Sequence, residues 1–177
     1  MNWTQYFINI AQQVKLKSKD ERTQIGAVIV GLSNQIVSTG YNSFPRGIND
    51  NVPERQERPE KYFWFEHAER NALYNASLNG ISTKDCSIYL TCGIPCTDCC
   101  RGIINAGIRE VYCVEGGGAS GERWEEHAKR SLMMFREAGV HVQLHKTAVD
   151  GELMYDSQTM QTLVYQTGLE LLNNIEL

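Results

Sequence analysis

Two short segments carry residue types and spacings that suit metal chemistry, His-Ala-Glu at residues 67–69 and Pro-Cys-Thr-Asp-Cys at residues 95–99. In the first turn of a helix, Cys96 and Cys99 point to roughly the same side and can reach one ion. The positive end of that helix stabilises both thiolates. With His67 as a third ligand, a tetrahedral zinc ion keeps one open position, which is the pattern of catalytic zinc, because structural zinc usually fills all four.

Glu69 is close enough to His67 to act at the open position, and its carboxylate suits general acid and base work better than ligation. Zinc lowers the pKa of a bound water, so a neighbouring group must take the water proton and deliver it to a leaving group. His-x-Glu combined with Pro-Cys-x-x-Cys is the known signature of zinc deaminases, and this chain matches it. A bare Cys-x-x-Cys would leave a redox pair or half of a structural zinc site as equal alternatives.

The elements that must position these residues follow from hydrophobic spacing. Apolar residues at steps of three and four from Trp3 to Val14 predict a helix over about residues 2–17. The remaining pattern predicts strands at 25–31, 35–42, 86–91, 110–115 and 140–145, and helices at 67–80, 96–106, 122–138 and 157–174. Both metal-binding segments therefore stand at helix starts.

This order of elements predicts one α/β domain over residues 1–177, with a mixed sheet of about five strands and helices on both faces. Residues 86–115 form a βαβ unit, so its two strands should be parallel. An insert loop over about residues 41–62 holds three of the four prolines, and loops of this length are often functional. Residues 146–177 form a C-terminal extension. The glycine-rich stretch at 116–121 is either a flexible connection or a phosphate cradle.

Composition narrows the class of protein and of partner. The chain has 177 residues, 42% hydrophobic and 21% charged, and its 17 Lys+Arg against 21 Asp+Glu give a net charge of −4. A phosphate backbone normally needs a basic stripe, so a nucleic-acid partner is disfavoured, whereas a small anionic substrate needs only a local pocket. We expect no membrane partner and a reducing cytoplasm, where clustered cysteines indicate metal or redox chemistry.

The chain resembles the deoxycytidylate (dCMP) deaminases of bacteria and bacteriophages, within the cytidine deaminase superfamily, over about residues 3–145. This likeness implies a three-layer α/β/α cytidine deaminase-like fold and the zinc-dependent conversion of dCMP to dUMP and ammonia, in the host cytoplasm if the protein is phage-encoded. dUMP is the precursor for thymidylate synthesis. The segments that carry the likeness are DERTQIGAVIV (20–30), STGYNSFPRG (38–47), ERPEKYFWFEHAERNALYNA (57–76), PCTDCC (95–100) and RSLMMFREAGV (130–140).

The resemblance also implies roles for site residues. It gives His67, Cys96 and Cys99 as ligands of one catalytic Zn²⁺ and Glu69 as the catalytic proton shuttle. It further implies that Asn42 contacts the sugar, the Ala68 backbone the base, and Ile25 the pocket wall.

The 5′-phosphate needs a cation. Lys19 and Arg22 lie between the first helix and the strand that carries Ile25, so they are the best local candidates, although such residues are often ordinary solvated surface.

Relatives of this kind are typically homohexamers, activated by dCTP with Mg²⁺ and inhibited by dTTP. We therefore expect a homo-oligomer, with a hexamer favoured, and effector contacts from Tyr41, Ser43, Phe44 and Arg46 at the start of the insert loop. The family commonly has glycine where this chain has Ser43, which makes close backbone approach to a nucleotide less certain.

Several alternatives remain open from the sequence. The same zinc chemistry can act on another cytosine nucleotide or nucleoside, on a base, or on a polynucleotide, and a non-catalytic zinc-binding module is a further class. Retention of Glu69 favours an enzyme. We expect no second zinc, because no cysteine precedes Cys86 and no histidine precedes His67. The cysteines expected to be buried free thiols are Cys86, Cys92, Cys100 and Cys113.

Overall fold

The computed structural model describes residues 1–116, 122–148, 151–158 and 160–161. Short 3-10 helices follow the first helix at Lys15–Lys17 and interrupt the insert loop at Pro53–Gln56. The other elements, in chain order, are α1 (Trp3–Val14), β1 (Gly26–Val30), β2 (Ile36–Tyr41), α2 (Lys61–Trp64), α3 (Ala68–Leu78), β3 (Ser87–Leu90), α4 (Thr97–Asn105), β4 (Glu110–Val114), α5 (Glu122–Glu137), β5 (His141–Thr147) and β6 (Leu153–Tyr155).

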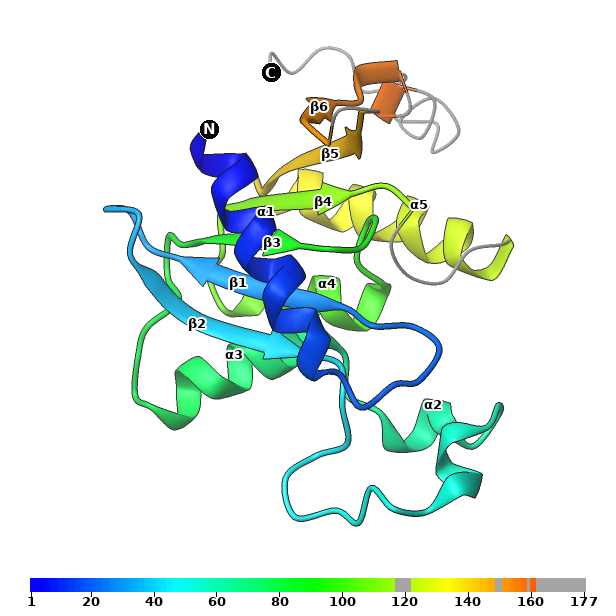
Figure 1. Ribbon diagram of the computed structural model, residues 1–177. Coiled ribbons are helices and arrows are strands. Elements are labelled where there is room, and N and C mark those ends of the chain that lie inside the picture. Colours follow the sequence, from blue (N-terminus) through cyan, green and yellow to red (C-terminus); the bar gives the residue numbers. More distant parts are fainter. Residues whose placement is uncertain (117–121, 149–150, 159, 162–177) are drawn as a thin grey trace.

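The strands form one mixed sheet in the order β2-β1-β3-β4-β5-β6 (Figure 1). β3, β4 and β5 are parallel, with Ile88 opposite Val111, which confirms the predicted βαβ unit. The sheet has one strand more than expected, since β6 pairs antiparallel with β5. The helix expected over 157–174 and the glycine-rich stretch at 116–121 both lie largely outside the described residues.

Helices cover both faces of the sheet, as the three-layer expectation required. α1 crosses one face, where Phe7 and Ile8 are buried against Val28 (Figure 1). α3, α4 and α5 cover the other face, where Cys100 and Phe135 belong to the larger core. Because both faces of β1 are covered, all five of its residues are buried, which explains its continuous apolar run.

The contact between α3 and β2 is unusually close. A Cβ added at Gly40 would lie 2.3 Å from the backbone nitrogen of Ala72 and 2.4 Å from the backbone oxygen of Ala68. Two side-chain amides of α3 are hydrogen-bonded to β2: Asn71 donates to the carbonyl of Tyr41 (2.8 Å), and Asn75 donates to that of Thr39 (2.6 Å). The end of β2 is thereby fixed against the start of α3.

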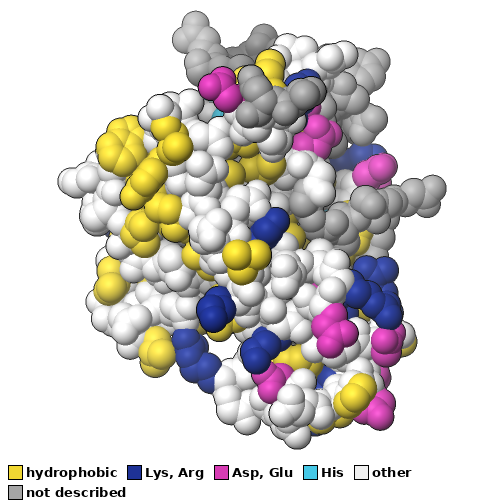
Figure 2. All heavy atoms as spheres, in the orientation of Figure 1, with side chains coloured by type: hydrophobic (Ala, Val, Ile, Leu, Met, Phe, Trp, Pro, Cys, Tyr) yellow, Lys and Arg dark blue, Asp and Glu magenta, His cyan; other side chains and the backbone are white. Residues whose placement is uncertain are grey.

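The surface in Figure 2 carries cationic and acidic side chains interspersed, without a continuous basic area on the face shown. This distribution agrees with the net charge of −4 and gives a polynucleotide backbone no extended basic track on that face. Among the described residues, no helix combines the length and the apolar character needed to cross a membrane.

Candidate active site

Two helix starts bring the candidate metal ligands together. His67 is the residue before α3 and Cys96 the residue before α4, and both have extended backbone conformations. Cys99 lies in the first turn of α4. Nδ1 of His67 is 3.5 Å from Sγ of Cys96 and 3.4 Å from Sγ of Cys99. The sequence prediction that these segments occupy helix starts is therefore confirmed.

The donor geometry fits a zinc ion. Nitrogen and sulfur ligands at 2.0–2.3 Å from tetrahedral zinc are separated by roughly 3.6 Å, close to the distances found here. The donor atoms of His67, Cys96 and Cys99 all lie within 4.8 Å of one another. Hydrogen bonds from Cys99 and His67 lower the pKa of the Cys96 thiol to about 3, so its sulfur is held ready as a thiolate.

Glu69 stands beside this cluster in the first turn of α3, with only 3% of its surface exposed. Burial raises the pKa of its carboxyl, because the charged form loses solvation. A carboxyl with a raised pKa can both accept a proton and deliver it near neutral pH. Its position allows it to exchange protons with a small molecule bound next to the ligands.

A pocket of about 510 Å³ opens over the cluster. Its walls include His67, Cys96 and Glu69, so the candidate chemistry faces a cavity large enough for a nucleotide-sized molecule. The three substrate contacts implied by the resemblance, Asn42, Ala68 and Ile25, all line it as well.

Hydrogen bonds hold the Asn42 side chain in place. Its Oδ1 accepts from the backbone nitrogen of Ile25 (2.7 Å), and its Nδ2 donates to the carbonyl of Thr23 (2.7 Å). Asn42 follows β2 directly, so the close β2–α3 contact sets its position relative to Glu69.

Comparisons with known proteins agree with a zinc site at these residues. The model of the "cytidine and deoxycytidylate deaminase zinc-binding region" family matches residues 1–115. An uncharacterized deaminase of Aliivibrio fischeri is 40% identical over 140 residues, which cover 79% of this chain and 91% of that protein. The chain belongs to the cytidine and deoxycytidylate deaminase family.

Two further relatives extend the comparison. Human deoxycytidylate deaminase is 35% identical over 145 residues, covering 79% of this chain and 78% of that protein. The cyanophage S-TIM5 dCMP deaminase, solved in complex with dCMP and dUMP, has a TM-score of 0.62 at 23% identity and covers 78% of this chain and 93% of that one. This structural likeness confirms the expected cytidine deaminase-like fold.

The two cations expected at the phosphate do not line the pocket of this family member. Arg22 pairs with Glu57 at 2.8 Å, and both side chains are more than half exposed. Lys19 pairs with Asp50 at 3.0 Å. Their role in phosphate binding stays a prediction; neither lines the pocket at the metal ligands, and Lys19 instead lines a second cavity.

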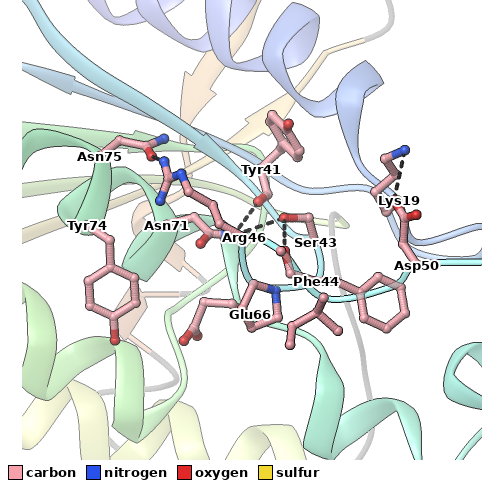
Figure 3. Close-up of a pocket in the computed structure, with 13 residues that line it drawn as sticks. Lys19, Tyr41, Ser43, Phe44, Arg46, Asp50, Glu66, Asn71, Tyr74 and Asn75 are labelled. Carbon is pink, nitrogen blue, oxygen red and sulfur yellow. Dashed lines mark hydrogen bonds and ion pairs between the residues drawn. The ribbon is translucent and has the colours of Figure 1, made fainter. Parts of the chain in front are cut away.

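A second cavity of about 360 Å³ gathers the residues expected to bind effectors. Tyr41, Ser43, Phe44 and Arg46 all line it, and Figure 3 shows Arg46 reaching Asn75 on α3. These four residues therefore belong to one concave site that is separate from the deaminase pocket.

Backbone contacts connect the second cavity to the metal cluster. Ser43 and Glu66 exchange two backbone hydrogen bonds, of 3.1 and 2.8 Å. The Glu66 carboxylate accepts from the backbone nitrogen of His67 at 3.0 Å. A displacement of the Ser43 backbone can therefore be transmitted through Glu66 to His67, a candidate zinc ligand.

Sequence reasoning missed several pocket residues of this deaminase. Lys61 and Arg58 line the pocket from the α2 segment, which consists of α2 and the turn before it (residues 58–64), and Trp124 lines it from α5. Tyr62 and Phe65 line the pocket, whereas Phe63 is 79% exposed. A signal for Lys61 was available, since it lies within residues 57–76, one of the segments that carry the family resemblance.

The remaining cysteines are free thiols, as expected, and burial raises the pKa of all four. Cys100 is fully buried in the core, with its pKa raised to about 11. Cys92 lines the deaminase pocket in the bend that follows β3, so it is less enclosed than expected.

Proposed function

We propose that the protein is a dCMP deaminase, which hydrolyses dCMP to dUMP and ammonia with zinc and so supplies dUMP for thymidylate synthesis. One observation carries this proposal: the cluster of three candidate ligands borders a pocket that the buried Glu69 and Asn42 also line. Relatives named deoxycytidylate deaminase, and a related structure that holds dCMP and dUMP, support the choice of substrate.

In this proposal His67, Cys96 and Cys99 hold the zinc ion. When bound, zinc lowers the pKa of water and makes a nucleophile available near neutral pH. Glu69 accepts a proton from the attacking water and delivers it to the amino nitrogen of cytosine. A new C4–O bond then replaces the C4–N bond, and ammonia leaves.

Other groups of the pocket position the substrate. The Asn42 amide is fixed by Ile25 and Thr23 and faces the sugar. The Ala68 backbone faces the base, and Ile25 supplies an apolar wall. These contacts hold C4 near the proton carrier, and such positioning contributes much of the rate of many enzymes.

A non-catalytic zinc-binding module and a deaminase of another cytosine nucleotide or nucleoside are the alternatives. A module gains nothing from burying Glu69 beside its ligands, because an uncompensated buried carboxylate costs free energy. Glu69 therefore favours an enzyme.

The substrate is tested by ammonia release from cytidine, deoxycytidine, CMP, dCMP and dCTP with the zinc-loaded protein. We expect dCMP to have the highest kcat/KM, since the pocket must recognise the base, the deoxyribose and one phosphate together. A higher kcat/KM for deoxycytidine or CMP would reassign the substrate, and no ammonia from any of the five would favour the module.

We further propose that dCTP, with Mg²⁺, activates and dTTP inhibits by binding the 360 Å³ cavity in a homo-oligomer, with a hexamer favoured. Arg46 and Lys19 are the cations among its described lining residues and suit a triphosphate. Exposed apolar side chains, including Trp3 (58%), Phe63 (79%) and Leu78 (69%), offer surface for contacts between subunits.

Regulation predicts a defined kinetic pattern. dCTP should shift sigmoidal dCMP kinetics toward hyperbolic ones and dTTP should do the reverse, because each binds one of two states more tightly. Arg46→Ala should weaken the dCTP response by roughly 10-fold or more in concentration, as expected for loss of a charge-assisted contact. Hyperbolic kinetics that neither nucleotide changes, in a protein that sediments as a monomer, would refute both regulation and oligomerisation.

A further inference from the structure

The α2 segment places a buried cation in the deaminase pocket. Lys61 has only 7% of its surface exposed and lines the pocket with His67 and Glu69. Its Nζ lies 2.5 Å from Oδ2 of Asp20 in an ion pair. This one carboxylate oxygen can take only one of the three N–H donors of Nζ, and Nζ has no other hydrogen-bond acceptor within the described part of the chain.

Asp20 is already engaged as an acceptor. Its Oδ1 accepts from the backbone nitrogens of Arg22 (2.8 Å) and Thr23 (3.0 Å), and its Oδ2 accepts from Nδ2 of Asn42 (3.3 Å). Asp20 therefore balances the charge of Lys61 but leaves two of its three N–H donors without an acceptor. Buried donors without partners are rare in native proteins, so these donors point to a bound group that supplies acceptors.

Arg58 brings a second cation to the same wall. It is exposed, lies at one end of the α2 segment, and makes no ion pair with another described residue. Its guanidinium is 5.8 Å from the ring centre of Tyr62, which also lines the pocket. Apart from His67, Arg58 and Lys61 are the basic residues among the described groups that line this pocket.

The acidic groups of the pocket restrict where an anion can sit. Glu69 lies beside the metal ligands, Glu115 and Glu125 lie elsewhere on the lining, and Asp20 lines the pocket as the ion-pair partner of Lys61. A phosphate placed near Glu69, Glu115 or Glu125 would be repelled, whereas Lys61 balances the charge of Asp20 and Arg58 adds a further positive charge on the same side. The α2 wall is thus the favourable place for the negative end of a ligand whose base lies at Glu69.

We propose that Lys61 and Arg58 bind the 5′-phosphate of the nucleotide substrate, in place of Lys19 and Arg22. This inference rests on the proposed function. The ammonium of Lys61 donates charge-assisted hydrogen bonds to the phosphate from within the pocket, and the guanidinium of Arg58 closes over it from the rim. Specificity for a nucleotide over a nucleoside thus comes from the insert loop.

The test compares Lys61→Met and Arg58→Gln with Lys84→Gln, a control at an exposed lysine in the loop before β3. kcat/KM is measured for dCMP and deoxycytidine, and binding of dUMP and deoxyuridine by calorimetry. Each pocket variant should lose roughly 10- to 100-fold for dCMP and dUMP, as expected for one charge-assisted contact, with the nucleosides unchanged. The control should match the wild type throughout.

Three results would overturn the inference. Equal losses for nucleotides and nucleosides in Lys61→Met would show that Lys61 only positions Asn42 through Asp20. An unchanged preference for dCMP in both pocket variants would exclude the phosphate contact. A loss of that preference in Arg22→Gln or Lys19→Gln, with Lys61→Met unaffected, would return the role to those cations.

Folding and function have separate readouts. If Lys61→Met does not fold because Asp20 loses its partner, Arg58→Gln at an exposed position and Lys61→Arg decide the matter. Lys61→Arg should keep a preference for dUMP over deoxyuridine, and Arg58→Gln should lose it. Loss of this preference in Lys61→Arg together with its retention in Arg58→Gln would exclude the contact. A wild-type protein that deaminates no cytosine nucleotide would refute the proposed function, whereas normal dCMP turnover in the pocket variants would refute this inference alone.

Discussion

Glu69→Gln is expected to keep zinc bound and to lower the turnover of dCMP by about 10²- to 10⁴-fold or more, the usual range for loss of general acid and base catalysis. The amide preserves the shape of a side chain that is 3% exposed, but it cannot accept or deliver the proton. kcat from ammonia release, zinc content and dUMP binding together separate a chemical defect from a binding defect.

Glu125→Gln is the matched control, because Glu125 lines the same pocket but is exposed. We expect its turnover to stay within a few-fold of wild type. If Glu69→Gln retained more than a tenth of wild-type turnover with full zinc, another group would have to carry the proton. Loss of zinc in Glu69→Gln would instead make the carboxylate part of the metal site.

Cys96→Ala should lose zinc and unfold at a markedly lower temperature, because the ion ties the start of α3 to the start of α4. Metal ligation is coupled to folding, so the binding free energy of the ion contributes to stability. Zinc per chain and thermal unfolding with and without a chelator measure both effects. The wild type should hold about one zinc per chain.

Cys100→Ala is the control for this change, since Cys100 is fully buried but its sulfur lies 3.5 Å from the Ser131 carbonyl oxygen and belongs to no metal cluster among the described residues. It should keep its zinc and lose about 1 kcal/mol of stability, a typical cost for a core substitution. Full zinc in Cys96→Ala would contradict the ligand assignment, and a reproducible wild-type value near two per chain would contradict the expectation that the protein has no second zinc.

The sequence predicted the elements that have local periodicity. β3, α4 and β4 follow directly from an apolar run, a helix start and a second apolar run, and the metal ligands could be found because the helix starts are local features. β6 and α2 were missed because three or four residues are too few to show a period. The formation of β6 depends on its pairing with β5, and the formation of α2 depends on the packing of the insert loop.

The charged residues of the site were harder to predict than the ligands. Lys19 and Arg22 lie next to Ile25 in the chain, and nearness in sequence made them candidates for the phosphate. Their positions depend on Asp50 and Glu57, which come from the insert loop. Burial of Lys61 likewise depends on a distant partner, Asp20, and no local pattern reports such a contact.

The missing side chain at Gly40 also limits how this centre can be rebuilt in another scaffold. A designer who grafts only the two helix starts would transplant the ligands without the strand that carries Asn42. An ordinary side chain at position 40 would push α3 away from β2, because Ala68 and Ala72 leave it no room. The smallest unit that can be transferred is therefore β2 with the starts of α3 and α4, including Gly40, Ala68 and Ala72, kept in their present relative positions.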